Sequence, residues 1–307
     1  MQTRTQMRSQ VKPGCPGLEN TNEPLKCVFS TVTTFKVGTG TTAKKQQSKN
    51  LWFAKQCDED SYAIRKINPQ FVPVGDETYV DRETLLSEYT PEVEIHNQQV
   101  QPAMAALNKT LAKGDKHRED NKPLSAEMEY TRALDVDETN VRAIFGLGLV
   151  YLERNDREKG LAVFDQLVAM EAAFDEDHKH LFNEFGIALR KNQLYEESIR
   201  YYTRASELTE DDENLFYNLA RVFYEKNDWE HCFLFVEKAL KLDPDHTAAI
   251  SLGQVMSIMA DDPKKREKHG KPEVPTEIAE QVKTLLKKSN SSAMMEFPTE
   301  GLGGKRV

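Results

Sequence analysis

The chain has 307 residues, 38% of them hydrophobic and 30% charged, and a formal net charge of −9. This composition is that of a largely helical globular protein with room for about two domains. No apolar run approaches the roughly 20 residues that a membrane-spanning helix needs. The four cysteines form neither a metal-type CxxC pair nor a disulfide framework. We therefore expect a cytoplasmic protein without disulfide bonds.

The first 26 residues are polar, contain three prolines and offer little apolar surface to bury. They include no apolar run typical of a secretory signal, so we expect a mobile N-terminal arm. Residues 1–50 carry eight Lys and Arg against two Glu, a local balance of +6. This basic stretch contrasts with the acidic chain that follows.

From residue 27 to 96 the sequence changes to β-branched and aromatic residues, which predicts a small β-rich domain with one short helix. The expected strands are short: 28–35, 51–54, 62–64, 71–72 and 79–80. Turn signals lie at residues 38–40, at 58–61 and at Gly75. Asp81 has the side chain of a helix N-cap, and the helix that follows must end before Pro91.

Gly38 to Thr42, followed by Lys44 and Lys45, superficially resembles a phosphate-binding loop. The spacing does not match GxxxxGK[ST] and no helix-forming segment follows, so we expect a hairpin loop. With Lys49, Trp52 and Phe53 nearby, this loop has the residue types that bind single-stranded nucleic acid by charge and stacking. Aromatic residues in a sheet core, beside lysines that keep a loop soluble, are the favoured alternative.

Four stretches repeat one pattern every 34 residues: 107–140, 141–174, 179–212 and 213–246, with residues 175–178 inserted once. The eighth position is always small: Gly114, Gly148, Gly186 and Ala220. The twenty-fourth position is larger: Tyr130, Phe164, Tyr202 and Val236. Small residues at helical spacing from large ones predict that each stretch is a pair of packed helices.

This pattern resembles the tetratricopeptide repeat (TPR), with its small residues at positions 8, 20 and 27, an aromatic at 24 and Pro at 32. Repeat four ends in the expected Pro244, whereas Glu138, Ala172 and Glu210 replace the proline in the other repeats. The resemblance implies a mainly α fold, a TPR-type α-α superhelical solenoid of four hairpins over residues 97–260. Residues 247–259 would supply its capping helix.

Beyond the repeats, residues 261–274 are rich in Lys and predict a charged linker. An amphipathic helix is predicted over residues 276–288, where four apolar residues share one face: Ile278, Val282, Leu285 and Leu286. We favour docking of this helix on the last repeat over a role as a free binding segment. The tail, residues 289–307, is expected to be loose.

The resemblance also implies a concave groove lined by positions 2, 5, 6, 9, 12 and 13 of each first helix. The candidate partner-binding residues at these positions are Arg142, Phe145, Leu149, His180, Asn183, Ile187, Arg190, Asn214, Tyr217, Asn218, Arg221 and Tyr224. Such amides can bond a peptide backbone, and such guanidinium groups can bind a carboxylate. The Lys and Asn clamp of chaperone-tail TPR proteins is missing, because its positions hold Leu111, Asp115, Phe145 and Leu149.

We therefore expect a non-enzymatic adaptor that binds a peptide or helix of a protein partner in this groove, with no cofactor, no metal and no membrane. His178 and His180 suggest no metal site, because residues two apart point to different sides of a helix. For the groove residues there is an alternative: they form an ordinary solvated wall, or the C-terminal helix or the β-domain fills the groove.

Two other functions stay open. The first is nucleic-acid binding through the basic arm and the Lys44–Phe53 loop, with the repeats as a tether. The second and weaker one is a regulatory subunit whose β-rich domain senses a small ligand. The sequence does not fix the oligomeric state or the partner.

Overall fold

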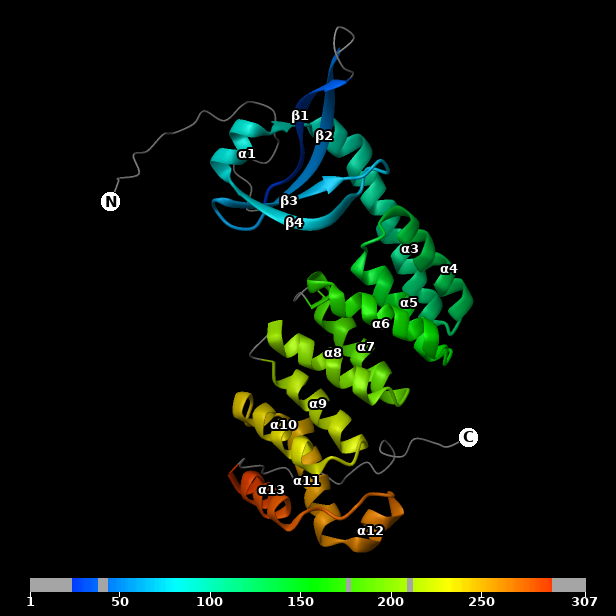
Figure 1. The fold of residues 1–307 in the computed structure, drawn as a ribbon, viewed down its shortest axis with the longest axis vertical. Helices are drawn as coiled ribbons and strands as arrows, with labels where there is room; N and C mark the ends of the chain where they lie inside the picture. The colour runs from blue at the N-terminus through cyan, green and yellow to red at the C-terminus, as the bar shows by residue number, and fades with distance from the viewer. Residues whose placement is uncertain (1–23, 38–43, 175–177, 209–211, 289–307) are drawn as a thin grey trace, which may run out of the picture. The chain divides into compact units, whose positions relative to one another are not determined.

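The computed structural model describes residues 24–37, 44–174, 178–208 and 212–288 (Figure 1). The chain divides into two compact units after Val150, and each is described by itself. The predicted fold class is confirmed, since an antiparallel sheet precedes pairs of helices with TPR spacing. Most of the expected mobile arm, the 38–42 loop, residues 175–177 of the insertion and the expected loose tail lie outside the described residues.

The sheet of the first unit has the strand order β4-β3-β2-β1-β5, with every pair antiparallel. Its strands are β1 (Lys26–Val37), β2 (Lys44–Gln56), β3 (Ser61–Ile67), β4 (Pro73–Asp81) and β5 (Thr90–Pro91). β1 and β2 are longer than predicted. The Lys44–Phe53 stretch is therefore strand and not loop, because it pairs residue by residue with β1.

The strand predicted at residues 79–80 is confirmed as part of β4, whereas the strand predicted at residues 71–72 is wrong. Phe71 has a left-handed backbone with a φ of 60°, and β4 begins only at Pro73. Gly75 has a φ of 77°, and the pairing with β3 moves from Val74 directly to Thr78. Gly75 thus lies in a bulge inside one strand. Glycine adopts the positive φ of this bulge readily because it has no Cβ.

Both faces of the sheet pack against helices. One face packs, through Phe29 and Ile64, against Leu85 of α1 (Arg82–Glu88). The other packs, through Phe53, against Val100 at the end of the π-helical turn η2 (His96–Val100). This turn continues α2 (Val93–Ile95) and leads directly into α3 (Gln101–Glu119).

The sheet and the first helix pair belong to the same compact unit, although the sequence suggested a boundary near residue 97. Asn68, in the turn after β3, donates through Nδ2 to the backbone oxygen of Val136 at 2.6 Å. At the other end of the sheet, Asp81 caps α1 as predicted, since its Oδ1 accepts the Thr84 N–H at 2.7 Å.

The helix pairs follow the 34-residue frame. They are α3 with α4 (Pro123–Val136), α5 (Val141–Glu153) with α6 (Arg157–Ala169), α7 (Lys179–Lys191) with α8 (Tyr195–Leu208), and α9 (Glu213–Glu225) with α10 (Trp229–Leu242). The predicted capping helix is α11 (Thr247–Asp261), and the short 3-10 helix η3 (Glu171–Phe174) precedes the insertion. The division between the two units falls within α5.

Position 15 of every repeat has a left-handed backbone, a regularity that the sequence pattern did not predict. Asn121, Asn155, Gln193 and Asn227 have φ values from 56° to 65°. The residue after each one donates its N–H to the carbonyl five residues earlier, as Asp228 does to Phe223 at 2.9 Å. Every first helix therefore ends in the same Schellman-type turn, which reverses the chain into the second helix.

In the first and third repeats, the packing uses the small and aromatic positions as predicted. The Tyr202 ring lies where a Cβ on Gly186 would stand, and the Tyr130 ring lies against both Gly114 and Gly146. Tyr130 is 0% and Tyr202 1% exposed. The helices can come this close only because glycine has no side chain at these positions.

The C-terminal helix α13 (Thr276–Lys288) docks on α10 and α11, as the sequence favoured. Its Ile278 and Val282 are buried, and Lys283 Nζ lies 2.6 Å from Asp261 Oδ1. The segment expected to be only a linker includes the short helix α12 (Pro263–Lys268). None of the helices in the described ranges combines the length and apolar character that crossing a membrane requires.

We predict that Gly186→Ala destabilises the protein, because the new methyl group would overlap the buried Tyr202 ring. Overpacking of this kind costs about 1–3 kcal/mol. The midpoint of unfolding in urea measures the effect.

The matched control is Gly253→Ala in α11. Its Cβ would lie 3.2 Å from Cδ2 at the flexible end of Leu286, and Ala is about 1 kcal/mol more favourable than Gly in a helix. We expect its midpoint to be unchanged or raised. Equal losses in both variants would contradict the proposed role of the Tyr202 contact.

Candidate functional site

The candidate residues on α5 lie in the first unit and are held by the core. Phe145 and Leu149 are at most 2% exposed, so neither presents a surface in this structure. Arg142 is bound to one oxygen of Asp115, whose other oxygen accepts the Tyr130 hydroxyl at 2.7 Å. This group links helices α3, α4 and α5 and has a structural role there.

The remaining candidates lie on α7 and α9, which contact each other in the second unit. We name the surface formed by Asn183, Arg190, Tyr217, Asn218 and Arg221 the α7–α9 face. All five side chains are half-buried. His180, in the first turn of α7, is exposed, and Ile187 is half-buried.

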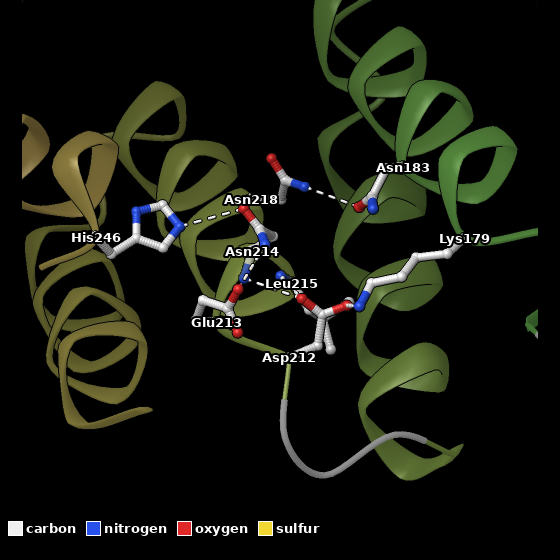
Figure 2. Close-up of polar contacts among 8 residues, drawn as sticks. All are labelled: Lys179, Asn183, Asp212, Glu213, Asn214, Leu215, Asn218 and His246. Carbon is white, nitrogen blue, oxygen red and sulfur yellow. Dashed lines mark hydrogen bonds and ion pairs between the residues drawn. The ribbon is translucent and has the colours of Figure 1, made fainter. Parts of the chain in front are cut away.

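An asparagine pair joins the two helices at this face. Figure 2 shows Asn218 Nδ2 donating to Asn183 Oδ1, at 3.0 Å. The Tyr202 hydroxyl donates to the backbone oxygen of Asn183 at 3.3 Å, which fixes α7 against α8 at the same residue. Within the described part of the chain, Asn183 Nδ2 and Asn218 Oδ1 have no hydrogen-bond partner. The pair thus presents one open amide donor and one open amide acceptor.

A histidine from the next helix approaches the same face. His246 is the N-cap of α11, and its Nδ1 accepts the Ala249 N–H at 3.2 Å. Its Nε2 is therefore the nitrogen that carries a proton and donates to Asn214 Oδ1, at 3.3 Å (Figure 2). The imidazole ring also packs on Tyr217, with ring centroids 5.4 Å apart. Asn214 and Tyr217 are consequently held in fixed positions.

The start of α9 is held by a buried carboxylate. Asp212 Oδ1 accepts the N–H groups of Asn214 and Leu215 at 3.0 and 3.2 Å. Its Oδ2 lies 3.1 Å from Lys179 Nζ at the start of α7 (Figure 2). One side chain therefore both caps α9 and connects it with α7.

Two arginines lie beyond the asparagine pair and share one carboxylate. Arg190 Nη1 and Arg221 Nη2 lie 3.5 and 3.4 Å from Glu225 Oε1. Burial, followed by the nearby positive charge of Arg221, lowers the pKa of Arg190. Tyr224 is 3% exposed, and Lys271 from the segment after α12 lies over its ring, 4.1 Å from the centroid.

The aromatic residues suggested for nucleic-acid stacking are engaged within the sheet. Phe53 is buried. The Trp52 indole N–H donates to Thr31 Oγ1 at 2.9 Å, and the ring packs edge-on against Tyr89. Among the described residues, no group of three His, Cys, Asp or Glu side chains is placed to hold a metal ion.

Comparison with solved structures finds similar helical proteins. PilF of Pseudomonas aeruginosa is 18% identical over 62% of this chain and 78% of its own, with a TM-score of 0.40. MamA is 17% identical over 60% and 89%, with a TM-score of 0.42. TTC0263, a TPR protein of Thermus thermophilus, is 16% identical over 59% and 98%, with a TM-score of 0.38.

No protein-family model matches the chain, and no curated protein matches it. The assignment therefore rests on the chain's own geometry: paired helices in a 34-residue frame, with aromatic rings seated on glycines and one common turn at position 15. The helical part of the chain is built of repeats of the tetratricopeptide type.

We predict that Asp212→Ala lowers the free energy of unfolding by about 1–2 kcal/mol, because α9 loses its N-cap. Asp212→Asn keeps an acceptor for the two N–H groups and loses only the charge opposite Lys179, so we expect a smaller loss. Urea unfolding of both variants measures the difference. Equal losses in the two variants would show that the ion pair with Lys179, and not the cap, is the main contribution.

Proposed function

We propose that the protein is a non-enzymatic adaptor that binds a peptide segment of a protein partner on the α7–α9 face. The observation that supports this most directly is the asparagine pair, which has one amide donor and one amide acceptor without a partner among the described residues. A peptide backbone offers a carbonyl and an N–H, which complement these two groups.

An extended segment fits this arrangement better than a helix. Inside a helix the backbone donors and acceptors bond to each other, so a docked helix would offer only side chains to the asparagine pair. An extended segment keeps its backbone groups free. The Tyr217 ring, held by His246, adds a rigid apolar contact beside the pair.

The face is organised before any ligand binds. The Tyr202 hydroxyl fixes the Asn183 backbone, and Asp212 fixes the start of α9. Side chains that are already ordered lose little conformational entropy on binding, which favours affinity. Helices α7, α8 and α9 together would thus form the binding element of the chain.

We predict that Asn218→Ala weakens peptide binding by about ten-fold, because it removes the open acceptor and releases Asn183 from its fixed position. Twelve-residue peptides selected from a displayed library on the full chain serve as probes. Fluorescence anisotropy gives their dissociation constants with the wild type and the variant.

Thr203→Ala is the matched control, because Thr203 is exposed on α8 and lies outside the α7–α9 face. We expect this variant to bind the selected peptides as the wild type does. Far-UV circular dichroism should show equal helicity in all three proteins. Selected peptides that bind Asn218→Ala with unchanged affinity would refute the proposed site.

A further inference from the structure

Three cationic side chains from three segments meet at one end of the α7–α9 face. Arg190 comes from α7, Arg221 from α9, and Lys271 from the connection between α12 and α13. Only 17% of the Arg190 side chain and 16% of the Arg221 side chain are exposed. Lys271 Nζ donates to the backbone oxygen of Tyr224 at 2.7 Å, which places it over the last turn of α9.

The negative charge in this cluster is smaller than the positive charge. Among the described residues, the carboxylate whose charge acts on both Arg190 and Lys271 is that of Glu225. Lys226, next in sequence, is paired with Glu196 at 2.5 Å and so adds no net charge. Three cations and one carboxylate leave two positive charges in excess, in a place where burial makes unpaired charge costly.

The guanidinium groups also have unused donors. Their bonds to Glu225 are long, at 3.5 and 3.4 Å, and each guanidinium has five N–H donors. Arg221 Nε is buried and has no hydrogen-bond partner within the described ranges. Buried donors are normally satisfied, so an unpaired one beside excess positive charge indicates that an acceptor is missing.

We propose that Arg190, Arg221 and Lys271 form a binding site for a carboxylate group of the bound peptide. This inference rests on the proposed function and specifies its ligand as an acidic peptide. Planar guanidinium groups match the two oxygens of a carboxylate, and charge-assisted bonds of this kind are about twice as strong as neutral ones.

The spacing of the two sites limits where the acidic residue stands. Arg221 follows Asn218 by three residues on α9, about 4.5 Å along the helix axis. Arg190 follows Asn183 by seven residues on α7, about 10.5 Å. A carboxylate one to three residues from the peptide bond held by the asparagine pair would therefore reach the cluster.

Glu225 competes with the ligand for the same arginines. Glu225→Gln removes the competing charge, so acidic peptides should bind this variant several-fold more tightly than the wild type. The double variant Arg190→Gln/Arg221→Gln should have the opposite effect. These opposite signs would not be produced by a purely structural role of the cluster.

The test uses the full chain and the displayed twelve-residue library. We expect the selected peptides to be enriched in Asp, Glu or a free C-terminus. Replacing the critical carboxylate of a selected peptide by its amide should weaken binding to the wild type about ten-fold or more, and binding to the double variant hardly at all. Peptides with free and amidated C-termini separate a terminal carboxylate from a side-chain one.

Arg200→Gln is the matched control, because Arg200 on α8 is 61% exposed in its side chain and pairs with Asp165 at the surface. We expect it to bind like the wild type, and all variants to keep the helicity seen by circular dichroism. A selected peptide bearing phosphoserine that binds more than ten-fold better than the same peptide with Glu would overturn the carboxylate assignment.

Binding to the Asn218→Ala variant and to the double arginine variant tests the peptide-binding face and the carboxylate site separately. Peptides that lose affinity for Asn218→Ala but bind the double arginine variant normally would overturn the carboxylate site and leave the adaptor function standing. A library in which no peptide binds the wild-type chain would remove both.

Discussion

Two of the four helix pairs depend on one kind of contact, a buried tyrosine ring seated where glycine has no side chain. Tyr130 makes this contact with Gly114 and Gly146, and Tyr202 makes it with Gly186. A large aromatic surface is buried while two helix backbones come together, so hydrophobic burial and close packing are gained at the same place. The hydroxyl group of Tyr202 then reaches Asn183 on the α7–α9 face. The core contact thus also positions a residue of the candidate site.

The two ends of the α7–α9 face differ in how well their polar groups are satisfied. Near the start of α9, Asp212 accepts the first N–H groups of the helix and His246 binds the Asn214 side chain. Near its end, the cations exceed the carboxylates and a buried donor has no partner within the described residues. A ligand that supplies an acceptor would remove this imbalance, which is why the proposed carboxylate site lies at this end.

The repeat frame made the helical part predictable from sequence, because each helix pair places small and large residues at the same spacing. The starts of α5, α7 and α9 coincide with the predicted repeat boundaries at residues 141, 179 and 213. The sheet was less predictable. The Lys44–Asn50 half of β2 has no apolar alternation, because it pairs only with β1 and extends past β3, so the period-2 signal was absent.

Parts of the site depend on contacts that one sequence pattern cannot show. The apolar character of Phe145 and Leu149 was itself a sign of burial, but the repeat positions favoured a groove. Position 15 holds Asn in three repeats and Gln193 in the other, so the residue types do not mark the common left-handed turn that all four adopt. Lys271 reaches Tyr224 from outside the repeats, across 47 positions of sequence. Pairings over such separations are fixed by tertiary packing alone.

The docking of α13 also covers part of the last helices of the repeat stack. A stack of helix pairs normally grows by placing another pair on the exposed apolar side of its last helix. Here Ile278 and Val282 of α13 are buried in the packing on α10 and α11. A second copy of the chain would have to displace α13 before it could pack on α10 and α11 at the same place.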